Sequence, residues 1–254
     1  MAFTYICPKY ILMAQIKPYS DSDKTKKEQV TKMFDSISKE YDGLNRIITF
    51  GIDIKWRKRV IAIIEKNNPK RLLDIASGTG DLAIMTAQNT NASEIIGADI
   101  SEGMLAVGEE KIKKLGLSKR VRMQIADSEN LPYDSDYFDA VTVAFGVRNF
   151  ENLDKGIKEI HRVLKPNGVF VVLETSIPST PVIKQLYLFH SNFLLPFFGK
   201  LFSKDPKAYS YLSKSAKNFP YGEDFNNILI KNGFNNVYNK PQTFGAANIY
   251  VGEK

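Results

Sequence analysis

The sequence has little of several residue types that would point to particular classes of protein. Its 254 residues include a single cysteine, two histidines and one tryptophan. The lone cysteine, Cys7, cannot form an internal disulfide, and no cluster of cysteine and histidine has the spacing of metal ligands. We therefore expect a cytoplasmic protein without a bound metal.

Long hydrophobic runs are also missing. The longest apolar stretches, such as residues 193–198, fall far short of the roughly 20 residues needed to cross a bilayer. The net charge of +7 is spread along the chain, which fits solubility or attraction to an anionic membrane better than a nucleic-acid-binding arm. Residues 1–23 are expected to form a flexible N-terminal extension, with Met13 as the initiator, and residues 24–254 to form one domain.

From residue 71 onward, short β-branched runs alternate with segments of helical pattern. This alternation predicts a parallel sheet built from βαβ units. Helices are expected at Asp81–Gln88, Gly103–Leu115 and Leu153–Leu164, the last ended by a turn at residues 165–168. The expected strands are Arg71–Ile75, Glu94–Asp99, Val121–Ile125, Asp139–Ala144 and Val169–Glu174.

Two further strands are expected near the C-terminus, at Asn236–Asn239 and Ala247–Gly252. Their connection is too short for a helical crossover, so the pair must be antiparallel. The predicted fold is α/β and Rossmann-like, with a seven-stranded, mostly parallel sheet that ends in a C-terminal antiparallel hairpin.

Segments 24–68 and 178–220 lie outside this sheet and are candidate caps over a site. The second segment carries apolar residues at helical spacing, which would belong either to a cap or to an ordinary buried helix face. These residues are Ile183, Leu186, Tyr187, His190, Leu194 and Phe197.

A glycine-rich turn follows the first predicted strand. It contains Gly78 and Gly80, and a turn without Cβ atoms lets a ligand approach the backbone closely. Asp99 ends the second strand, where its carboxylate can accept hydrogen bonds from both hydroxyls of a ribose. This spacing favours a bound nucleoside.

The turn glycines, together with Ala83, also satisfy the looser dinucleotide pattern, so an NAD-dependent enzyme stays open at this point. Asp74 argues against it, because a carboxylate just before the turn suits the cationic amino-acid end of S-adenosylmethionine better than a pyrophosphate. The third strand is followed by Asp127 and Ser128, which can hold the amino group and ring edge of an adenine. Carboxylates at three successive strand ends favour S-adenosylmethionine as the cofactor.

Three further stretches resemble the quinone C-methyltransferases of menaquinone and ubiquinone biosynthesis. They are residues 33–42, residues 144–150, which read Ala-Phe-Gly-Val-Arg-Asn-Phe, and residues 161–166. Asn45 and Trp56 add to the first stretch. The resemblance extends over nearly the whole chain from residue 28 onward.

The resemblance implies the fold of the class I S-adenosylmethionine-dependent methyltransferases. It also implies that an Arg-Asn pair, Arg148 and Asn149, lies beside the methyl group of the cofactor. The cofactor contacts that it implies are at Thr79, Asp99, Asp127 and Ser128.

The chemistry of methyl transfer suggests roles for three residues. Transfer from a sulfonium destroys positive charge and is fastest in a dry pocket that holds an electron-rich carbon. A reduced quinol offers such a carbon once a hydroxyl loses its proton. Arg148 is expected to stabilise the developing quinolate. Asn149 would orient the hydroxyl or a water, and Tyr41 of the first cap would complete the hydrogen-bond chain.

The proton acceptor is not identified from the sequence. His190 lies on the apolar face of the second cap and can titrate near neutral pH, although a lone histidine on such a face is more often structural. His161 lies in a charged helix beside Arg162, where we expect it to be solvated or to cap the helix.

The resemblance implies a prenylated quinol as the substrate, most simply 2-demethylmenaquinol. A 2-methoxy-6-polyprenyl benzoquinol is the alternative, and another small acceptor stays open because the cofactor half of the protein does not distinguish acceptors. Apolar caps could line a prenyl channel, and a positive chain could dock on the inner face of the membrane. A homodimer is left open, whereas an RNA-binding module would need a basic stripe with interleaved aromatics that the sequence lacks.

Overall fold

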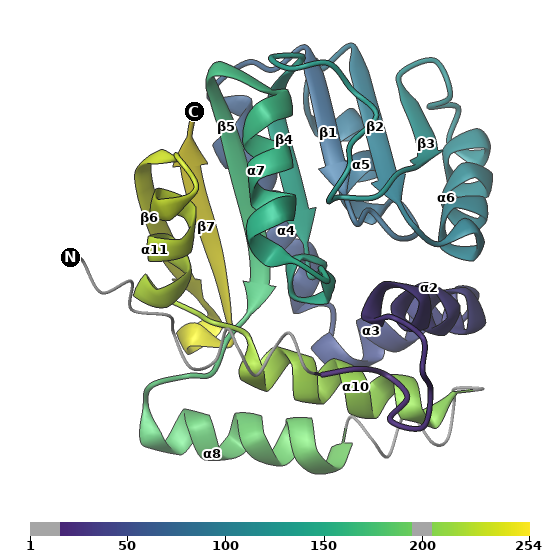
Figure 1. The fold of residues 1–254 in the computed structure, drawn as a ribbon, viewed down its shortest axis with the longest axis vertical. Coiled ribbons are helices and arrows are strands. Elements are labelled where there is room, and N and C mark those ends of the chain that lie inside the picture. The colour runs from purple at the N-terminus through teal and green to yellow at the C-terminus, as the bar shows by residue number, and fades with distance from the viewer. Residues whose placement is uncertain (1–15, 195–204) are drawn as a thin grey trace.

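The computed structural model describes residues 16–194 and 205–254 (Figure 1). These residues form a seven-stranded sheet of order β3-β2-β1-β4-β5-β7-β6. The direction of the strand order reverses between β1 and β4, which is where open α/β sheets bind their ligands. The strands are β1 (Arg71–Ile75), β2 (Glu94–Asp99), β3 (Val121–Ile125), β4 (Phe138–Ala144), β5 (Leu164–Thr175), β6 (Asn235–Gln242) and β7 (Ala247–Glu253).

The sheet confirms the predicted architecture. Strands β1 to β5 pair in parallel, and β7 pairs antiparallel with both β5 and β6. β1, β2 and β3 have the predicted bounds, and β4 begins one residue earlier than predicted. The C-terminal hairpin is closed by the short helix η3 (Thr243–Gly245).

The start of β5 was predicted wrongly. The strand begins at Leu164, so the predicted turn at residues 165–168 lies inside it. Phe138 of β4 pairs with Leu164, and the next pair joins Ala140 to Val169, so the turn residues form an irregularity within the sheet. The backbone N–H of Lys254 donates to the carbonyl oxygen of Gly168 at 3.1 Å. The C-terminal residue therefore holds these residues in the sheet, which local turn preference does not reveal.

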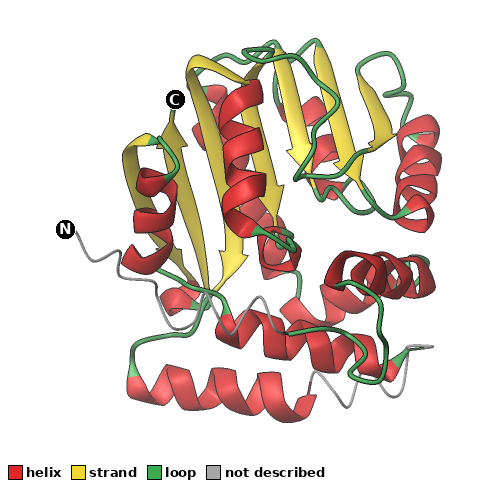
Figure 2. Cartoon of the chain, viewed as in Figure 1, coloured by secondary structure: helices red, strands yellow, loops and turns green. Residues whose placement is uncertain are grey.

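Helices cover both faces of the sheet (Figure 2). The three predicted helices are present with ends shifted by about one residue, as is usual for helix termini. The layer helices are α4 (Ile52–Glu65), α5 (Asp81–Asn89), α6 (Glu102–Lys114), α7 (Leu153–Val163) and α11 (Glu223–Lys231).

Side chains alternate across the strands and build one apolar cluster on each face. On one face Ile157 of α7 packs with Phe170 of β5, and on the other Val60 of α4 packs with Val171. All four side chains are fully buried, and burial of one such side chain contributes about 1.5–3 kcal/mol. The sheet is thus a rigid platform whose strand ends carry the site.

The cap helices lie beyond the carboxyl ends of the strands (Figure 1). The first cap segment supplies α2 (Lys26–Ile37) and α3 (Tyr41–Thr49), and the second supplies α8 (Pro181–Phe189), the π-helical turn η2 (His190–Leu194) and α10 (Pro206–Asn218). A third apolar cluster joins α2, α3 and α10, with Met33 and Tyr209 both fully buried. Ile16 and Tyr19 of the expected extension also pack on this cluster.

The two cap segments differ from expectation in detail. Helix α4, inside residues 24–68, packs on the sheet, so the first cap consists of α2 and α3. On α8 the residue Leu186 is 62% exposed, so an ordinary buried face is wrong for this position. Ile183 and Tyr187 are half-buried. Phe197 lies outside the described residues, as do the side chains of His190 and Leu194.

Candidate active site

The turn after β1 has a backbone that few residues can adopt. Gly78 and Gly80 have φ angles of 57° and 76°, and Ala76 shares the left-handed region at 50°. Glycine adopts these angles without the steric cost that a Cβ adds. The N–H of Ser77 donates to the carbonyl of Ala98 at 3.1 Å, which ties the turn to β2. The turn then enters α5, for which Gly80 is the N-cap residue.

Asp99 connects this turn to the end of β2. Its Oδ2 accepts a hydrogen bond from the N–H of Gly78 at 2.8 Å, and its Oδ1 accepts one from Ser101 at 2.9 Å. Burial raises the pKa of Asp99, and the two backbone donors oppose that rise. Each carboxylate oxygen has a second lone pair, so Asp99 is oriented to accept hydrogen bonds from a ribose.

A cavity lies at the carboxyl ends of β1 to β4. Helix α2 covers it, and Val30 and Phe34 of this helix line its wall. The apolar side chains and the carboxylates suit an adenosine. The predicted site residues that line it are Tyr41, Gly78, Asp99, Asp127, Ser128 and Asn149.

Asp127 already has partners at both oxygens. Lys27 of α2 donates to its Oδ2 at 2.6 Å, and the N–H of Glu129 donates to its Oδ1 at 2.9 Å. The hydrogen bond to Asp127 raises the pKa of Lys27. An adenine amino group at Asp127 would share the carboxylate with Lys27, which was not among the predicted site residues.

Asp74 lines a smaller adjoining cavity together with Gly78, Thr79 and Tyr41. It is 1% exposed, and its two oxygens accept hydrogen bonds from the hydroxyls of Ser77 and Thr142, each at 2.7 Å. Burial raises its pKa to about 6. A cation in this cavity would favour the charged carboxylate.

Of the other predicted cofactor residues, Thr79 already has a hydrogen-bond partner in the protein, and Gly80 shapes the backbone. The hydroxyl of Thr79 donates to Oδ1 of Asp42 at 2.6 Å, while the residue still lines the smaller cavity. Gly80 faces the sheet side, where a Cβ would lie 3.4 Å from the side chain of Met123. The role of Gly80 is to form the turn.

The stretch of residues 144–150 follows β4 and includes the short helix η1 (Val147–Asn149). Gly146 lies so close to the glycine-rich turn that a Cβ there would be 2.4 Å from the Cβ of Ala76. The preceding Phe145 has a φ of 60°, a strained conformation of the kind found at functional sites. Glycine is required at position 146 because the two loops touch.

Arg148 is buried and forms an ion pair with Glu174 at the end of β5. Its NH1 atom donates to Oε1 of Glu174 at 2.6 Å and to the carbonyl of Phe145 at 2.7 Å. Burial alone would lower the pKa of Arg148, but Glu174, Tyr41 and Tyr211 together outweigh burial and raise it. Within the described residues, Nε of Arg148 and Oε2 of Glu174 have no hydrogen-bond partner.

The hydrogen bond to Asn149 comes from the second cap. The hydroxyl of Tyr211 on α10 donates to its Oδ1 at 3.1 Å. On the other side of η1, Nζ of Lys26 donates to the carbonyls of Arg148 and Phe150, and burial lowers the pKa of Lys26 to about 8. Both caps therefore hold η1 in place.

A third cavity lies between the caps and borders Arg148. Phe145 also lines the first cavity, which α2 covers, and Tyr41 lines all three cavities. Burial raises the pKa of Tyr41, so its hydroxyl is a donor near neutral pH. Apolar and aromatic residues that line the third cavity include Ile48, Phe50, Ile52, Trp56, Tyr187 and Leu212.

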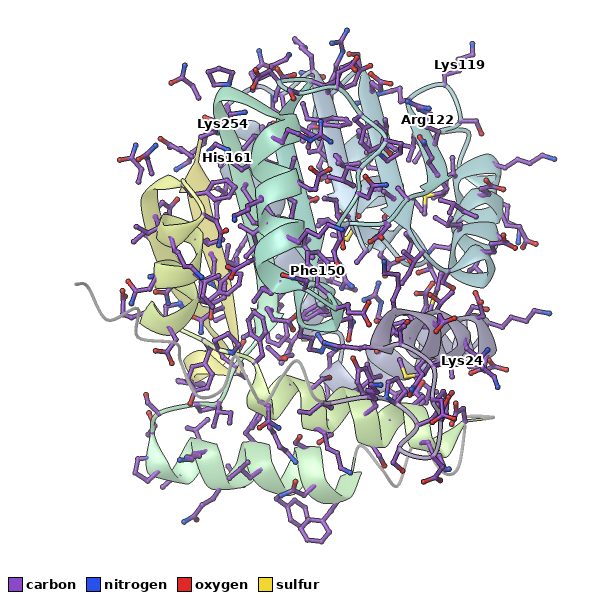
Figure 3. All side chains as sticks on the ribbon, viewed as in Figure 1. Lys24, Lys119, Arg122, Phe150, His161 and Lys254 are labelled. Carbon is purple, nitrogen blue, oxygen red and sulfur yellow. The ribbon has the colours of Figure 1, made fainter. Side chains whose placement is uncertain are left out.

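His161 lies on α7 away from the cap helices (Figure 3). Its ring packs edge-on against Phe234, with centroids 5.2 Å apart, and burial lowers its pKa. His161 is half-buried in the last turn of α7 and hydrogen-bonds the backbone of Gly233, just after α11, so a partly solvated or capping role stays a prediction. Its position excludes it from the three cavities.

The comparisons with known proteins agree with this geometry. The profile of the ubiE/COQ5 methyltransferase family matches residues 22–254. A demethylmenaquinone methyltransferase from Bacteroides fragilis is 45% identical over 240 residues, which are 94% of this chain and 98% of the relative. A ubiquinone/menaquinone biosynthesis C-methyltransferase UbiE from Geobacter sulfurreducens is 42% identical, with 90% of each chain covered.

Solved structures give the same fold at low sequence identity. A SAM-dependent methyltransferase from Thermotoga maritima matches with a TM-score of 0.62 and 18% identity, over 88% of this chain and 99% of that one. The [4+2]-cyclase SpnF matches with a TM-score of 0.59 and 17% identity, over 90% and 96%.

The sheet order and the strand-end site define an S-adenosylmethionine-dependent methyltransferase. The residues present fit this cofactor, because a cavity lined by apolar side chains and by the oriented carboxylate of Asp99 adjoins a small polar cavity that contains Asp74. The chain belongs to the ubiE/COQ5 methyltransferase family. S-adenosylmethionine is accordingly its methyl donor.

Proposed function

We propose that the protein transfers a methyl group from S-adenosylmethionine to a ring carbon of demethylmenaquinol. Asp99, Asp127 and Ser128 would hold the adenosine, and Asp74 the ammonium of the amino-acid end. The family's C-methylating relatives, which include a demethylmenaquinone methyltransferase, support this acceptor.

The single observation that carries the proposal is the position of Arg148. This buried cation borders a cavity whose exposed lining is largely apolar and which also contains the paired Arg57 and Asp53. Phe145 and Tyr41 line both this cavity and the cofactor cavity. A flat, apolar acceptor with an acidic hydroxyl beside the reacting carbon matches such a site. When bound, the cofactor supplies the electrophilic methyl group.

The residues of the chain prepare the acceptor carbon. Arg148 stabilises the quinolate oxygen, because a hydrogen bond to a charged acceptor is strengthened where water is excluded. The neutral hydroxyl of Tyr41 donates to the same region, and Asn149, held by Tyr211, orients the ring hydroxyl or a water. Aromatic walls exclude bulk water from the reacting carbon.

The test measures methyl transfer from labelled S-adenosylmethionine to chemically reduced demethylmenaquinol and to a polyprenyl benzoquinol. The expected result is transfer to the naphthoquinol, none to its oxidised quinone, and loss of transfer in Arg148→Ala with cofactor binding retained. Preference for the benzoquinol would move the function to ubiquinone biosynthesis. Cofactor binding without transfer to either quinol would overturn the substrate.

The surface of α8 supports peripheral contact with a membrane, where a prenylated quinol resides. Four of its apolar side chains recur at helical spacing on one exposed face: Val182 (66% exposed), Leu186 (62%), Phe189 (56%) and Phe193 (63%), the last on η2. The helix also contributes Tyr187 to the acceptor cavity. None of the helices in the described part of the chain has the length and apolarity to span a bilayer.

The charge of the second cap supports the same orientation. Residues 178–220 contain six lysines and a single acidic residue, Asp205. Such a segment is attracted to anionic lipid by about 1 kcal/mol for each basic residue near the surface. We infer that α8 lies at the inner face of the membrane, so that the quinol ring enters the cavity while its prenyl tail stays in lipid.

A further inference from the structure

A buried arginine at the start of α4 is not used by the mechanism above. Arg57 is 7% exposed, and its NH1 atom donates to Oδ2 of Asp53, which also accepts from Arg46. The Arg57 guanidinium lies over the ring of Phe145, 5.4 Å from its centroid. It is therefore fixed from two sides.

One donor of this guanidinium is still available. Within the described residues, Nε of Arg57 is buried and has no hydrogen-bond partner. A buried donor without a partner destabilises the fold, so the position calls for an acceptor. Arg57 lines both the small cavity that contains Asp74 and the acceptor cavity.

The small cavity is lined by the guanidinium of Arg57 and by three carboxylates. Asp42 and Asp81 are paired with Arg46 or Lys111, whereas the hydrogen bonds to Asp74 come from the hydroxyls of Ser77 and Thr142. The combination of Asp74 and Arg57 is complementary to an α-amino acid zwitterion, in which an ammonium and a carboxylate share one carbon. Gly78 lines both this cavity and the adenosine cavity, so the two are neighbours. The amino-acid end of a cofactor bound along Asp99 would enter the cavity beside Asp74.

We propose that Arg57 binds the carboxylate of the methionyl part of S-adenosylmethionine. Asp74 takes the ammonium of the same group. Arg57 thereby aligns the sulfonium beside Phe145, with which its guanidinium is already in contact. This role is independent of which quinol accepts the methyl group.

The other cations near the small cavity are paired with its remaining carboxylates, Asp42 and Asp81. Arg46 pairs with Asp53 and with Asp81, the latter at 2.6 Å. Lys111 pairs with Asp81 at 2.5 Å and with Asp42 at 2.8 Å. The described walls of the small cavity include Arg57 and neither of these two residues. Arg46 is therefore a matched control, because it shares Asp53 with Arg57 but lies outside the cavity.

The experiment compares binding of S-adenosylmethionine with binding of decarboxylated S-adenosylmethionine by titration calorimetry. The decarboxylated compound keeps the sulfonium and an amine but lacks the carboxylate. The wild-type protein and Arg46→Met should prefer the intact cofactor. In Arg57→Met the affinity for the intact cofactor should fall at least about tenfold, as for loss of a charge-assisted hydrogen bond, and the affinity for the decarboxylated compound should stay constant.

Arg57→Lys gives the same comparison with the charge retained, in case the methionine variant does not fold. It should keep part of the preference, because a lysine is a point charge without the planar fork. Equal weakening of both ligands, or an unchanged preference in both Arg57 variants, would overturn the proposal. Thermal unfolding of each variant without ligand separates loss of the fold from loss of the contact.

Discussion

The guanidinium of Arg148 and the carboxylate of Glu174 form an ion pair with an NH1 to Oε1 distance of 2.6 Å, and their side chains are 7% and 0% exposed. Thr175 adds its own N–H to the same oxygen at 2.8 Å. Glu174 thus fixes the direction in which Arg148 faces the acceptor cavity. Removal of either partner leaves an uncompensated charge in the interior.

Glu174→Gln should therefore lower kcat by about tenfold or more, the loss that follows from about 1.4 kcal/mol of transition-state stabilisation. The affinity for S-adenosylhomocysteine should not change, because Glu174 acts through Arg148 and lies outside the cofactor cavity. Steady-state kinetics with the quinol and calorimetry with S-adenosylhomocysteine give the two quantities.

Glu159→Gln is the control for this change, because Glu159 pairs with Arg162 on α7 at 2.8 Å. It should leave kcat unaltered. A full kcat in Glu174→Gln, with the fold intact, would show that Arg148 does not need its partner.

Cofactor affinity should rise with pH through about 6, the pKa of the buried Asp74. The charged carboxylate binds the ammonium, whereas the protonated acid does not. In Asp74→Asn this step in affinity should disappear and binding should be weak at every pH. Titrations with S-adenosylhomocysteine between about pH 5 and 8, on either side of the pKa of Asp74, test this. If the variant kept the same step in affinity, the step would belong to another group.

The stability of the free protein should change with pH in the opposite direction to the cofactor affinity. The pKa of Asp74 is raised in the fold from 3.8 to about 6, so its contribution is present below pH 3.8 and is lost as pH rises through 6. Asp74→Asn should therefore stabilise the free protein near pH 8 by up to about 3 kcal/mol. Urea unfolding at pH 8 and pH 4.5 measures this, and a gain that is larger at the lower pH would contradict it.

Lys27→Met should tighten cofactor binding by a factor of about two to five, since an exposed ion pair is worth at most about 1 kcal/mol. The reason is that Lys27 donates to Asp127 and lines the same cavity, so its removal leaves more of the carboxylate and more space to an adenine amino group. Calorimetry with S-adenosylhomocysteine checks this, and Lys24→Met, a nearby surface lysine, serves as control. Weaker binding in Lys27→Met would mean that Lys27 itself contacts the cofactor.

Leu186→Glu combined with Phe189→Glu should abolish flotation with phosphatidylglycerol vesicles at low salt. A charge on this face cannot enter the apolar layer, and added acid repels the anionic lipid. Ile230→Glu, the same type of change at a 55% exposed position on α11, should float like the wild type. Equal flotation of all three proteins would exclude α8 as the contact surface.

Much of the sheet and of the cofactor half could be predicted from the sequence because their signals are local. The β-branched runs gave five strands, and the glycines after β1 with Asp99 after β2 lie at adjacent strand ends. The Arg-Asn pair was found through the motif at residues 144–150. The prediction of a turn at residues 165–168 was wrong for a non-local reason, which is the backbone contact of these residues with Lys254, far along the chain.

The sequence by itself determined which segments form the strands. It also determined the turn that admits a nucleoside and the carboxylates that suit a cationic cofactor. Only the tertiary structure decided the partners: Glu174 lies 26 residues from Arg148, Tyr211 lies 62 from Asn149, and Lys27 lies 100 from Asp127. Backbone conformation depends on near neighbours, whereas the pairing of buried charges depends on which distant elements pack together. Periodicity and motifs carry the first kind of information and not the second.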